Sequence, residues 1–293
     1  MCIAFVYFNP SSSSSSTCPK FRLILASNRD EYLQRPTCSA KWHRRGDGDV
    51  LGALDEKAGG TWLAVDRAGR IGLLLNVHEA DHQLNAAAPS RGQFIMDFLS
   101  VASRSAQDYV THIVNENTPQ KCNGFHLLLI DRFSTAHQSN ESQKMVYYCN
   151  RTQSPQPELL EQGQYGFSTS WRKQPFRKVD KGLEKFREIV EGNSSTEELC
   201  QRLLVLLKDS TRYWPDETIT EHNSDKSIDF QESLSSIFVQ SSDPKYEYAT
   251  RCHTIVLIDA NGTVEFRQWQ RPSSAAETVD WSVVRHTWQT RSL

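Results

Sequence analysis

Several signatures of common protein classes are absent from this chain of 293 residues. Its 33 lysines and arginines nearly balance its 35 aspartates and glutamates, so the formal net charge is −2 and gives no sign of the basic face that nucleic-acid binding requires. No apolar run approaches the roughly 18 residues of a membrane-spanning helix. There is no glycine-rich phosphate loop and no strand–helix alternation, so dinucleotide-binding and P-loop classes have no support.

Paired cysteines are lacking as well. The seven cysteines are an odd number and include no C-x-x-C pair, which fits neither a disulfide framework nor a zinc finger. Reduced thiols in a cytosolic or organelle-facing compartment are the simplest interpretation. The N-terminus, MCIAFVYF, has no basic region and no cleavage site, so it does not predict a secretory signal. The feature that stands out is Cys2, directly behind the initiator methionine.

Strands are predicted mostly as hairpins, and helices as separate blocks. The predicted hairpins join residues 2–8 to 21–27, 61–65 to 70–77, and 254–259 to 263–269, the last around Asn261-Gly262. Further strands are predicted at 126–131 and 145–149, and capping boxes at Ser90 and Ser195 predict helix starts. A serine run within residues 10–18 predicts a flexible loop, and residues 209–248 are polar and irregular. This pattern indicates an α+β fold of antiparallel sheets covered by helices.

Cys2 is the first candidate for chemistry. If Met1 is removed, the free α-amine of Cys2 can act as the base for its own thiol, because its ordinary pKa is close to neutral. A nucleophile at the start of a first strand would lie at a sheet end. The alternative is that Cys2 is a small buried hydrophobe in a strand.

A polar cluster, Asn28-Arg29-Asp30-Glu31, follows the predicted second strand. In a hairpin the end of that strand lies near the start of the first, so the cluster is expected beside Cys2. Arg29 would lower a thiol pKa and hold an anionic group, and Asp30 would accept a hydrogen bond from the α-amine. A solvated loop that satisfies turn and helix-end backbone groups is the alternative.

Three other patterns carry weaker signals. Asn76 ends the strand predicted at 70–77, where its amide could donate to an oxyanion or simply cap the strand. Residues 78–82 read His-Glu-Ala-Asp-His, the H-E-x-x-H zinc pattern, but they abut a strand, and a solvated loop is favoured. Arg251 precedes the last hairpin and could complete a carboxylate clamp.

These residues together resemble the NRDE-domain family. The segments that carry the resemblance occur in the family's order from Met1 to about Trp281: MCIAFVYF, LILASNRDEYLQRP, GGTWLAVDRAGRIGLLLNV, NGFHLLLID and ATRCHTIVLIDANGTVEF. The resemblance implies an N-terminal-nucleophile-hydrolase-like fold, a four-layer αββα sandwich. It also implies one domain over residues 1–293, in place of the two domains that length alone suggests.

The resemblance also implies a role in Golgi organisation, protein secretion and lipid or acyl-CoA homeostasis, with cytoplasmic, Golgi and mitochondrial locations. Relatives with this fold are amidases and acyltransferases, and their catalytic positions match Cys2, Arg29, Asp30, Asn76 and Arg251. An acyl or lipid-type ligand, with acyl-CoA and haem as candidates, is expected, and no nucleic acid, resident cofactor or metal. Thr169 stands where the family often has an asparagine. Two interpretations remain open: an acyl-transferring or amide- and thioester-hydrolysing enzyme, and a non-catalytic acyl-CoA or haem carrier.

Overall fold

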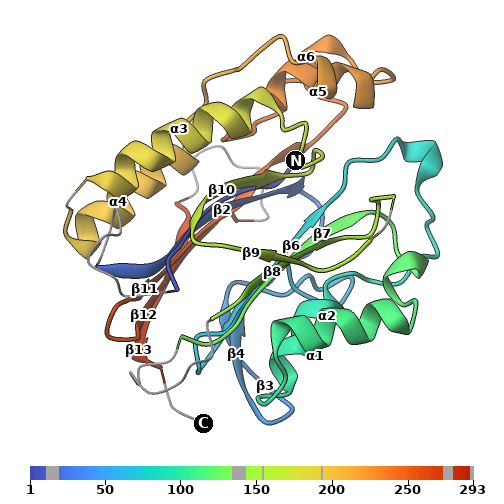
Figure 1. Cartoon of the computed structure of the whole chain (residues 1–293). Coiled ribbons are helices and arrows are strands. Elements are labelled where there is room, and N and C mark those ends of the chain that lie inside the picture. Colours follow the sequence, from blue (N-terminus) through green and yellow to red (C-terminus); the bar gives the residue numbers. More distant parts are fainter. Residues whose placement is uncertain (11–19, 134–142, 154, 193, 273–279, 291–293) are drawn as a thin grey trace.

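The computed structural model describes residues 1–10, 20–133, 143–153, 155–192, 194–272 and 280–290. Its core is two antiparallel sheets that face one another, with helices on both outer faces (Figure 1). The predicted four-layer αββα sandwich is therefore confirmed. The predicted serine-rich loop lies almost wholly outside the described residues.

Six strands form the first sheet and seven form the second. The first sheet has the order β10 (Gly163–Ser168), β1 (Ile3–Phe8), β2 (Phe21–Tyr32), β11 (Tyr248–Asp259), β12 (Thr263–Gln270) and β13 (Ser282–Gln289). The second has the order β3 (Lys41–Arg45), β4 (Gly48–Gly52), β5 (Leu63–Asp66), β6 (Ile71–Asn76), β7 (Phe125–Ile130), β8 (Met145–Cys149) and β9 (Glu158–Leu160). All three predicted hairpins are present, as the pairs β1–β2, β5–β6 and β11–β12.

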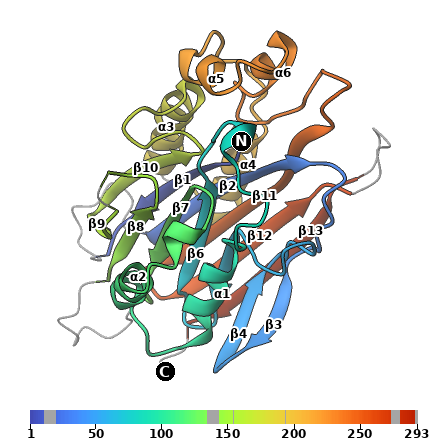
Figure 2. The same cartoon turned by 90° about the vertical axis from the view of Figure 1, so that its right-hand side faces the viewer.

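The helices divide between the two outer faces, as Figures 1 and 2 show. The first sheet is covered by α3 (Arg177–Glu191) and α4 (Thr196–Leu207), with α5 (Glu217–His222) and α6 (Ile228–Ser233) near the N-terminus. The second sheet is covered by α1 (Gln93–Ser100) and α2 (Ala106–Asn115). Two short 3-10 helices, η1 (Asp81–Gln83) and η2 (Pro119–Lys121), lie in connections.

Strand β1 shows why the central strands of the sheets are continuous apolar runs in the sequence. Successive side chains of a strand point to opposite faces. Ala4, Val6 and Phe8 therefore join the apolar cluster between the two sheets. Ile3 and Phe5, with Tyr7, join the cluster under α3 and α4. A strand buried on both faces has no polar side to reveal its period.

Strand β2 is longer than its apolar pattern predicts. It continues to Tyr32 and pairs along its length with β11, so residues 28–31 lie inside the sheet. The prediction that the strand ends at residue 27 and that this cluster follows it is wrong. Asn28, Arg29 and Asp30 are all buried. Buried polar side chains of this kind need specific partners.

The two predicted capping boxes have different outcomes. The Ser195 hydroxyl accepts a hydrogen bond from the Glu198 N–H at 3.2 Å and begins α4, as predicted. At α1 the N-cap is Gly92 without any side-chain cap, so the prediction for Ser90 is wrong. Gly92 packs closely against the Thr61 backbone, and the helix begins after it, at Gln93, two residues later than predicted. Residues 209–248 also differ from prediction, since they contain α5 and α6.

The contact between α3 and β1 leads to a stability prediction. A methyl group at Gly182 would approach Phe5 Cζ to 2.3 Å and Ile237 Cδ1 to 2.9 Å. Gly182→Ala should therefore destabilise the protein by about 1–3 kcal/mol through overpacking, although alanine is the better helix former. Chemical denaturation measures this change, with Glu188→Ala on the exposed face of α3 as the control, expected within about 0.5 kcal/mol of wild type. Stabilisation by Gly182→Ala would contradict the packing described.

Candidate active site

The first two residues lie at the end of the first sheet, on opposite faces of it. Cys2 packs against the cluster between the sheets, whereas Met1 belongs to the cluster on the helix side. Met1 is only 4% exposed, and Cys2 is partly exposed. The peptide unit between Cys2 and Ile3 is anchored because Ser168 at the end of β10 donates a hydrogen bond from Oγ to the Cys2 carbonyl at 2.8 Å.

The Cys2 thiol lies against the backbone of Asp30. Its sulfur is 3.4 Å from the Asp30 nitrogen and 3.6 Å from the Asp30 carbonyl oxygen. Burial raises the pKa of the thiol, and the nearby N-terminal ammonium opposes this shift. A thiol in this setting needs a base before it can act as a nucleophile.

The Asp30 carboxylate is the hub of the site. One oxygen accepts a hydrogen bond from Thr250 Oγ1 at 2.6 Å, and the other lies 3.5 Å from the Met1 nitrogen. Tyr248 is hydrogen-bonded to the same amine and donates to the Asp30 carbonyl at 3.1 Å. Burial lowers the pKa of the amine, against the attraction of Asp30. Asp30 thus faces the α-amine of Met1, whereas the contact expected from the sequence is with the α-amine of Cys2, and that contact stays a prediction.

Lys178 belongs to the same cluster, and the sequence interpretation missed it. It is fully buried in the first turn of α3, with Nζ 3.4 Å from the Met1 carbonyl oxygen and 3.0 Å from the Ser236 carbonyl oxygen. Burial lowers the pKa of the ammonium, and Asp30 opposes that shift. Lysine side chains are usually exposed, so nothing in the sequence marks this one as buried.

Arg29 points to the other face of the sheet, towards Cys2. Its guanidinium lies 4.2 Å from the centre of the Trp62 ring and donates to Thr37 Oγ1 at 3.2 Å. Carboxylate oxygens of Glu31 and Asp55 lie 3.6 and 3.7 Å away. These contacts fix the guanidinium in the wall beside the thiol.

Arg251 is the extra residue of a β-bulge in β11. The register with β2 shifts between Thr250 and Cys252, and the Arg251 side chain is fully buried. Its guanidinium donates to the backbone carbonyls of Tyr32 and Arg35, at 3.1 and 2.7 Å. In this structure Arg251 therefore holds the segment that follows β2.

Asn76 and Thr169 mark two strand ends that approach each other. Asn76 ends β6 and is exposed, so its amide can reach a ligand. Thr169 follows β10, and its carbonyl accepts a hydrogen bond from the His78 N–H at 2.8 Å. Its hydroxyl donates to Met1 Sδ at 3.3 Å. The residue in the family's asparagine position thus contacts the first residue of the chain.

The H-E-x-x-H string does not form one helical face. Glu79 is paired with Arg151 at 2.6 Å and accepts a hydrogen bond from the Gly124 N–H. The His78 ring lies 3.2 Å from the His222 carbonyl oxygen, and burial lowers the pKa of His78 to about 4. His82 is exposed within η1. Among the described residues, no three histidine, cysteine, aspartate or glutamate side chains are grouped to hold a metal ion.

Asn28 joins the first sheet to its helices. Its amide nitrogen donates to the carbonyls of Leu207 and Ile237, at 2.8 and 2.9 Å. Its amide oxygen lies 2.6 Å from His253 Nδ1, and the His253 ring stacks on Trp281. The contacts of Asn28 are therefore structural.

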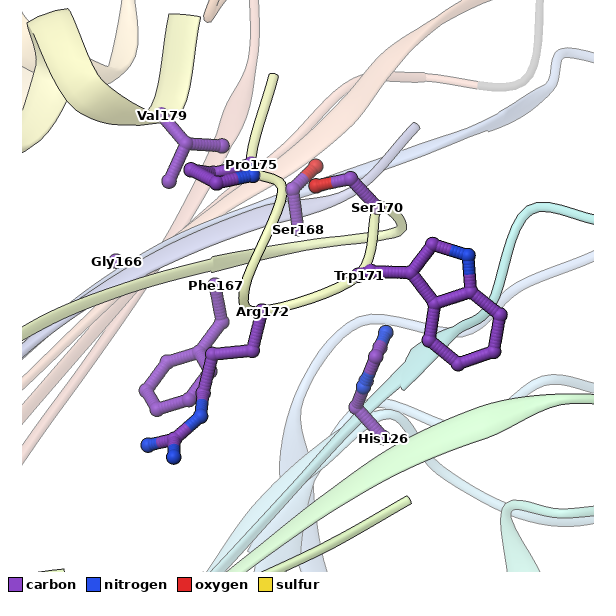
Figure 3. Close-up of a pocket in the computed structure, with 9 residues that line it drawn as sticks. All are labelled: His126, Gly166, Phe167, Ser168, Ser170, Trp171, Arg172, Pro175 and Val179. Carbon is purple, nitrogen blue, oxygen red and sulfur yellow. The ribbon is translucent and has the colours of Figure 1, made fainter. Parts of the chain in front are cut away.

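A small pocket lies beneath the loop that follows β10 (Figure 3). It has about 200 Å³ of empty space, part of it open to solvent, and His126 of β7 points up towards this loop. His126 Nδ1 is 2.9 Å from the Tyr147 hydroxyl, and burial lowers the pKa of the ring to about 4. Ser168 connects the pocket wall to the Cys2 carbonyl.

The fold and this site define an αββα protein with a cysteine behind its first residue and a buried carboxylate beside it. Residues 1–271 match the model of the family described as Transport and Golgi organisation 2, and the chain belongs to that family. Among curated relatives, the Mus musculus Transport and Golgi organization 2 homolog is 31% identical over 274 residues, 92% of each chain. The Homo sapiens homolog is 32% identical over 273 residues, also 92% of each.

Some solved structures are similar to the chain as well. A conjugated bile acid hydrolase variant from Clostridium perfringens has a TM-score of 0.41 at 9% identity, covering 99% of this chain and 97% of that one. The Caenorhabditis elegans ortholog of N-acylethanolamine-hydrolyzing acid amidase has a TM-score of 0.38 at 11% identity, covering 69% of this chain and 85% of that one.

Within the described ranges, no helix is both long and apolar enough to cross a membrane.

The Asn28–His253 link leads to a pH prediction. Burial lowers the pKa of His253 from its usual 6.5 to about 3, so the unfolded chain binds the proton more readily. The contribution of neutral His253 is complete above pH 6.5 and is lost as pH falls towards 3, with about 2 kcal/mol lost by pH 5. Denaturation at pH 7 and 5 should show a smaller pH-dependent loss for His253→Gln than for wild type.

His112→Gln is the matched control, because His112 is exposed on α2. Its pH-dependent loss should equal that of wild type. An equal loss in His253→Gln as well would contradict the assignment to His253.

Proposed function

We propose that the protein is a cysteine N-terminal-nucleophile enzyme that transfers acyl groups or hydrolyses amides or thioesters. The observation that carries this proposal is the meeting of three groups at one sheet end. The Cys2 thiol lies on the Asp30 backbone, and the Asp30 carboxylate is paired with the chain's α-amine. Removal of Met1 would take that amine away and expose a new α-amine at the nitrogen of Cys2 itself.

The environment supports the proton transfer that this chemistry needs. Burial raises the pKa of the thiol and lowers the pKa of the Met1 amine one residue before it. The α-amine of Cys2 that removal of Met1 would expose lies at the same buried sheet end, so we expect burial to lower its pKa as well. A buried amine is thus more often neutral near pH 7 and can accept the thiol proton. The thiolate then attacks the acyl carbon, and the protonated amine returns its proton to the leaving group. Asp30 orients the amine and stabilises its charged form.

The remaining predicted site residues have distinct parts in this proposal. Asn76, exposed at the end of β6, donates its amide hydrogen to the oxyanion. Arg29 and Arg251 are proposed to attract the anionic group of a substrate. Their contacts with Trp62 and with backbone carbonyls also keep the walls around Cys2 in place.

For the cellular role, we propose Golgi organisation, protein secretion and lipid or acyl-CoA homeostasis, in the cytoplasm with Golgi or mitochondrial association. The names of the mouse and human relatives support the Golgi part. A second candidate is a non-catalytic carrier of acyl-CoA or haem. The buried amine of Met1 favours it, because a retained Met1 leaves Cys2 without a free amine.

Protein expressed in cells should lack Met1, and an acyl-thioester probe should add its acyl group to Cys2. Intact-protein mass spectrometry reads both events. Cys2→Ser should abolish the addition, since the hydroxyl is a far weaker nucleophile. Cys38→Ser is the control because Cys38 is the other partly exposed cysteine among the described residues, and it should be labelled like wild type.

Two results would contradict the proposal that the protein is an enzyme. One is a mass that retains Met1 in the active protein. The other is full rescue of a cellular lipid or Golgi defect by Cys2→Ser, which would favour the carrier.

Asn76→Ala should lower kcat for thioester hydrolysis by about 100-fold or more, with little change in KM, because an oxyanion donor acts in the transition state. Steady-state kinetics measure both constants. Asn85→Ala, an exposed asparagine of the same connection, should behave as wild type. A purely structural role for Asn76 predicts lower stability and an unchanged kcat for the folded fraction.

A further inference from the structure

Lys178 is a fully buried lysine that has no part in the reaction proposed above. Its position is unfavourable for two reasons. Burial removes an ammonium group from water, and the first turn of α3 places it at the end of the helix where the dipole is positive. Its ammonium nitrogen lies 3.0 Å from the Ser236 carbonyl oxygen and 3.4 Å from that of Met1. Such a charge is stable only where a buried negative charge compensates it.

The Lys178 ammonium also lies close to the nitrogen of Cys2. The Met1 carbonyl oxygen, which Lys178 contacts, is bonded to the same carbon as the Cys2 nitrogen, so these two atoms are at most about 2.6 Å apart. Lys178 Nζ is therefore within about 6 Å of the Cys2 nitrogen. Removal of Met1 makes this nitrogen the α-amine that acts as the base in the proposed reaction. The amino groups of Lys178 and Cys2 are then neighbours.

Two carboxylates on the helix side of the sheet attract Lys178. Asp30 exerts the stronger attraction, and it also faces the chain's α-amine at 3.5 Å. Asp216 is the second, but its two oxygens already accept hydrogen bonds from the Arg177 N–H at 2.7 Å and the Ile219 N–H at 3.1 Å. Asp30 is thus the carboxylate that both amino groups require.

The other titratable groups near the amine supply no further negative charge. Burial raises the pKa of the Tyr248 hydroxyl and of the Cys2 thiol, so both are neutral near pH 7. The Glu31 carboxylate lies 3.6 Å from guanidinium nitrogens of both Arg29 and Arg35, and so has cations of its own. The two amino groups therefore share the single carboxylate at the hub of the site.

Two buried ammonium groups beside one carboxylate would leave a positive charge uncompensated, which burial disfavours. One of the two is therefore neutral. A lysine has an ordinary pKa of about 10.4 and an α-amine one of about 7.7–8.0, so the α-amine loses its proton first. We propose that Lys178 is a positioning residue for the proton transfer: its ammonium is the partner of Asp30 and thereby keeps the α-amine of Cys2 neutral, ready to accept the thiol proton. This inference rests on the proposed function and concerns its base.

The same arrangement lets the amine give the proton back. When the amine accepts the thiol proton, a thiolate and an ammonium form together, so the net charge of the cluster does not change. Asp30 attracts the new ammonium and Lys178 repels it. The repulsion favours transfer of the proton onward to the leaving group.

Titration of the amine by 15N NMR tests this inference without any catalysis. The full chain beginning at residue 2 carries Cys2→Ala, so that no neighbouring thiol titrates, and is compared with the same chain carrying Lys178→Met as well. The titration midpoint of the amine should rise by about one pH unit or more, because a positive charge within about 6 Å no longer opposes protonation. Lys178→Gln, which keeps a donor for the Ser236 carbonyl, should give the same shift and serves if the methionine variant does not fold.

Lys181→Met is the matched control, because Lys181 is exposed on the same helix, and it should leave the midpoint unchanged. Equal midpoints with and without the charge at Lys178 would overturn the inference. A merely structural lysine predicts that result together with lower stability.

An activity assay separates this inference from the proposed function. In the chain beginning at Cys2, Lys178→Met should move the acid limb of kcat/KM for hydrolysis of S-ethyl thiobutanoate to higher pH by the same amount, since a protonated amine cannot accept the thiol proton. A raised NMR midpoint without any thioester hydrolysis supports the role of Lys178 and contradicts the enzyme proposal alone. Hydrolysis with an unmoved acid limb and an unmoved midpoint overturns the role of Lys178 and leaves the nucleophile proposal standing.

Discussion

The buried carboxylate of Asp30 is the constraint on which the candidate site depends. It lies inside β2, where one oxygen is held by Thr250 of the neighbouring strand and the other faces the chain's amine. A buried carboxylate is stable only when cations or donors surround it. The long pairing of β2 with β11 supplies Thr250 and Tyr248, and α3 supplies Lys178 to the same cluster. Four segments far apart in the sequence therefore supply the groups around this one carboxylate.

The same groups also shift the pKa values of the thiol and the amine at the site. Burial alone favours a neutral thiol and a neutral amine, whereas Asp30 favours the charged amine. Lys178 adds a second positive charge, which opposes the charge on the amine. On the amine, the attraction of Asp30 therefore opposes the effects of burial and of Lys178. A base must both accept a proton and return it. Strong stabilisation of either its neutral or its charged form would stop one of these two transfers.

The sequence predicts the hairpins and the layers because turns and apolar periods are local signals. Asn261-Gly262 places the β11–β12 turn directly, and Gly262 has the positive φ of 82° that this turn needs. The end of β2 was missed since its last residues are polar, and only their burial against β11 shows them to be strand. The motif of residues 28–31 and Cys2 were found as candidates. Tyr248 and Lys178 were not, because nothing local marks a tyrosine at a strand start or a lysine in a first helical turn as buried.

Residues 1 and 2, just before β1, face opposite sides of the first sheet. This geometry links the question of whether Met1 is removed to the question of whether Cys2 is a nucleophile. Successive residues of a strand face opposite sides, so Met1 lies among the helices while the Cys2 thiol lies between the sheets. The cluster of Asp30, Tyr248 and Lys178 therefore surrounds the backbone atoms of residue 1 rather than the thiol. Groups on that side therefore act on the residue at the first position, which is Met1 in this structure. The proposed enzyme and the proposed carrier differ in whether that methionine is removed.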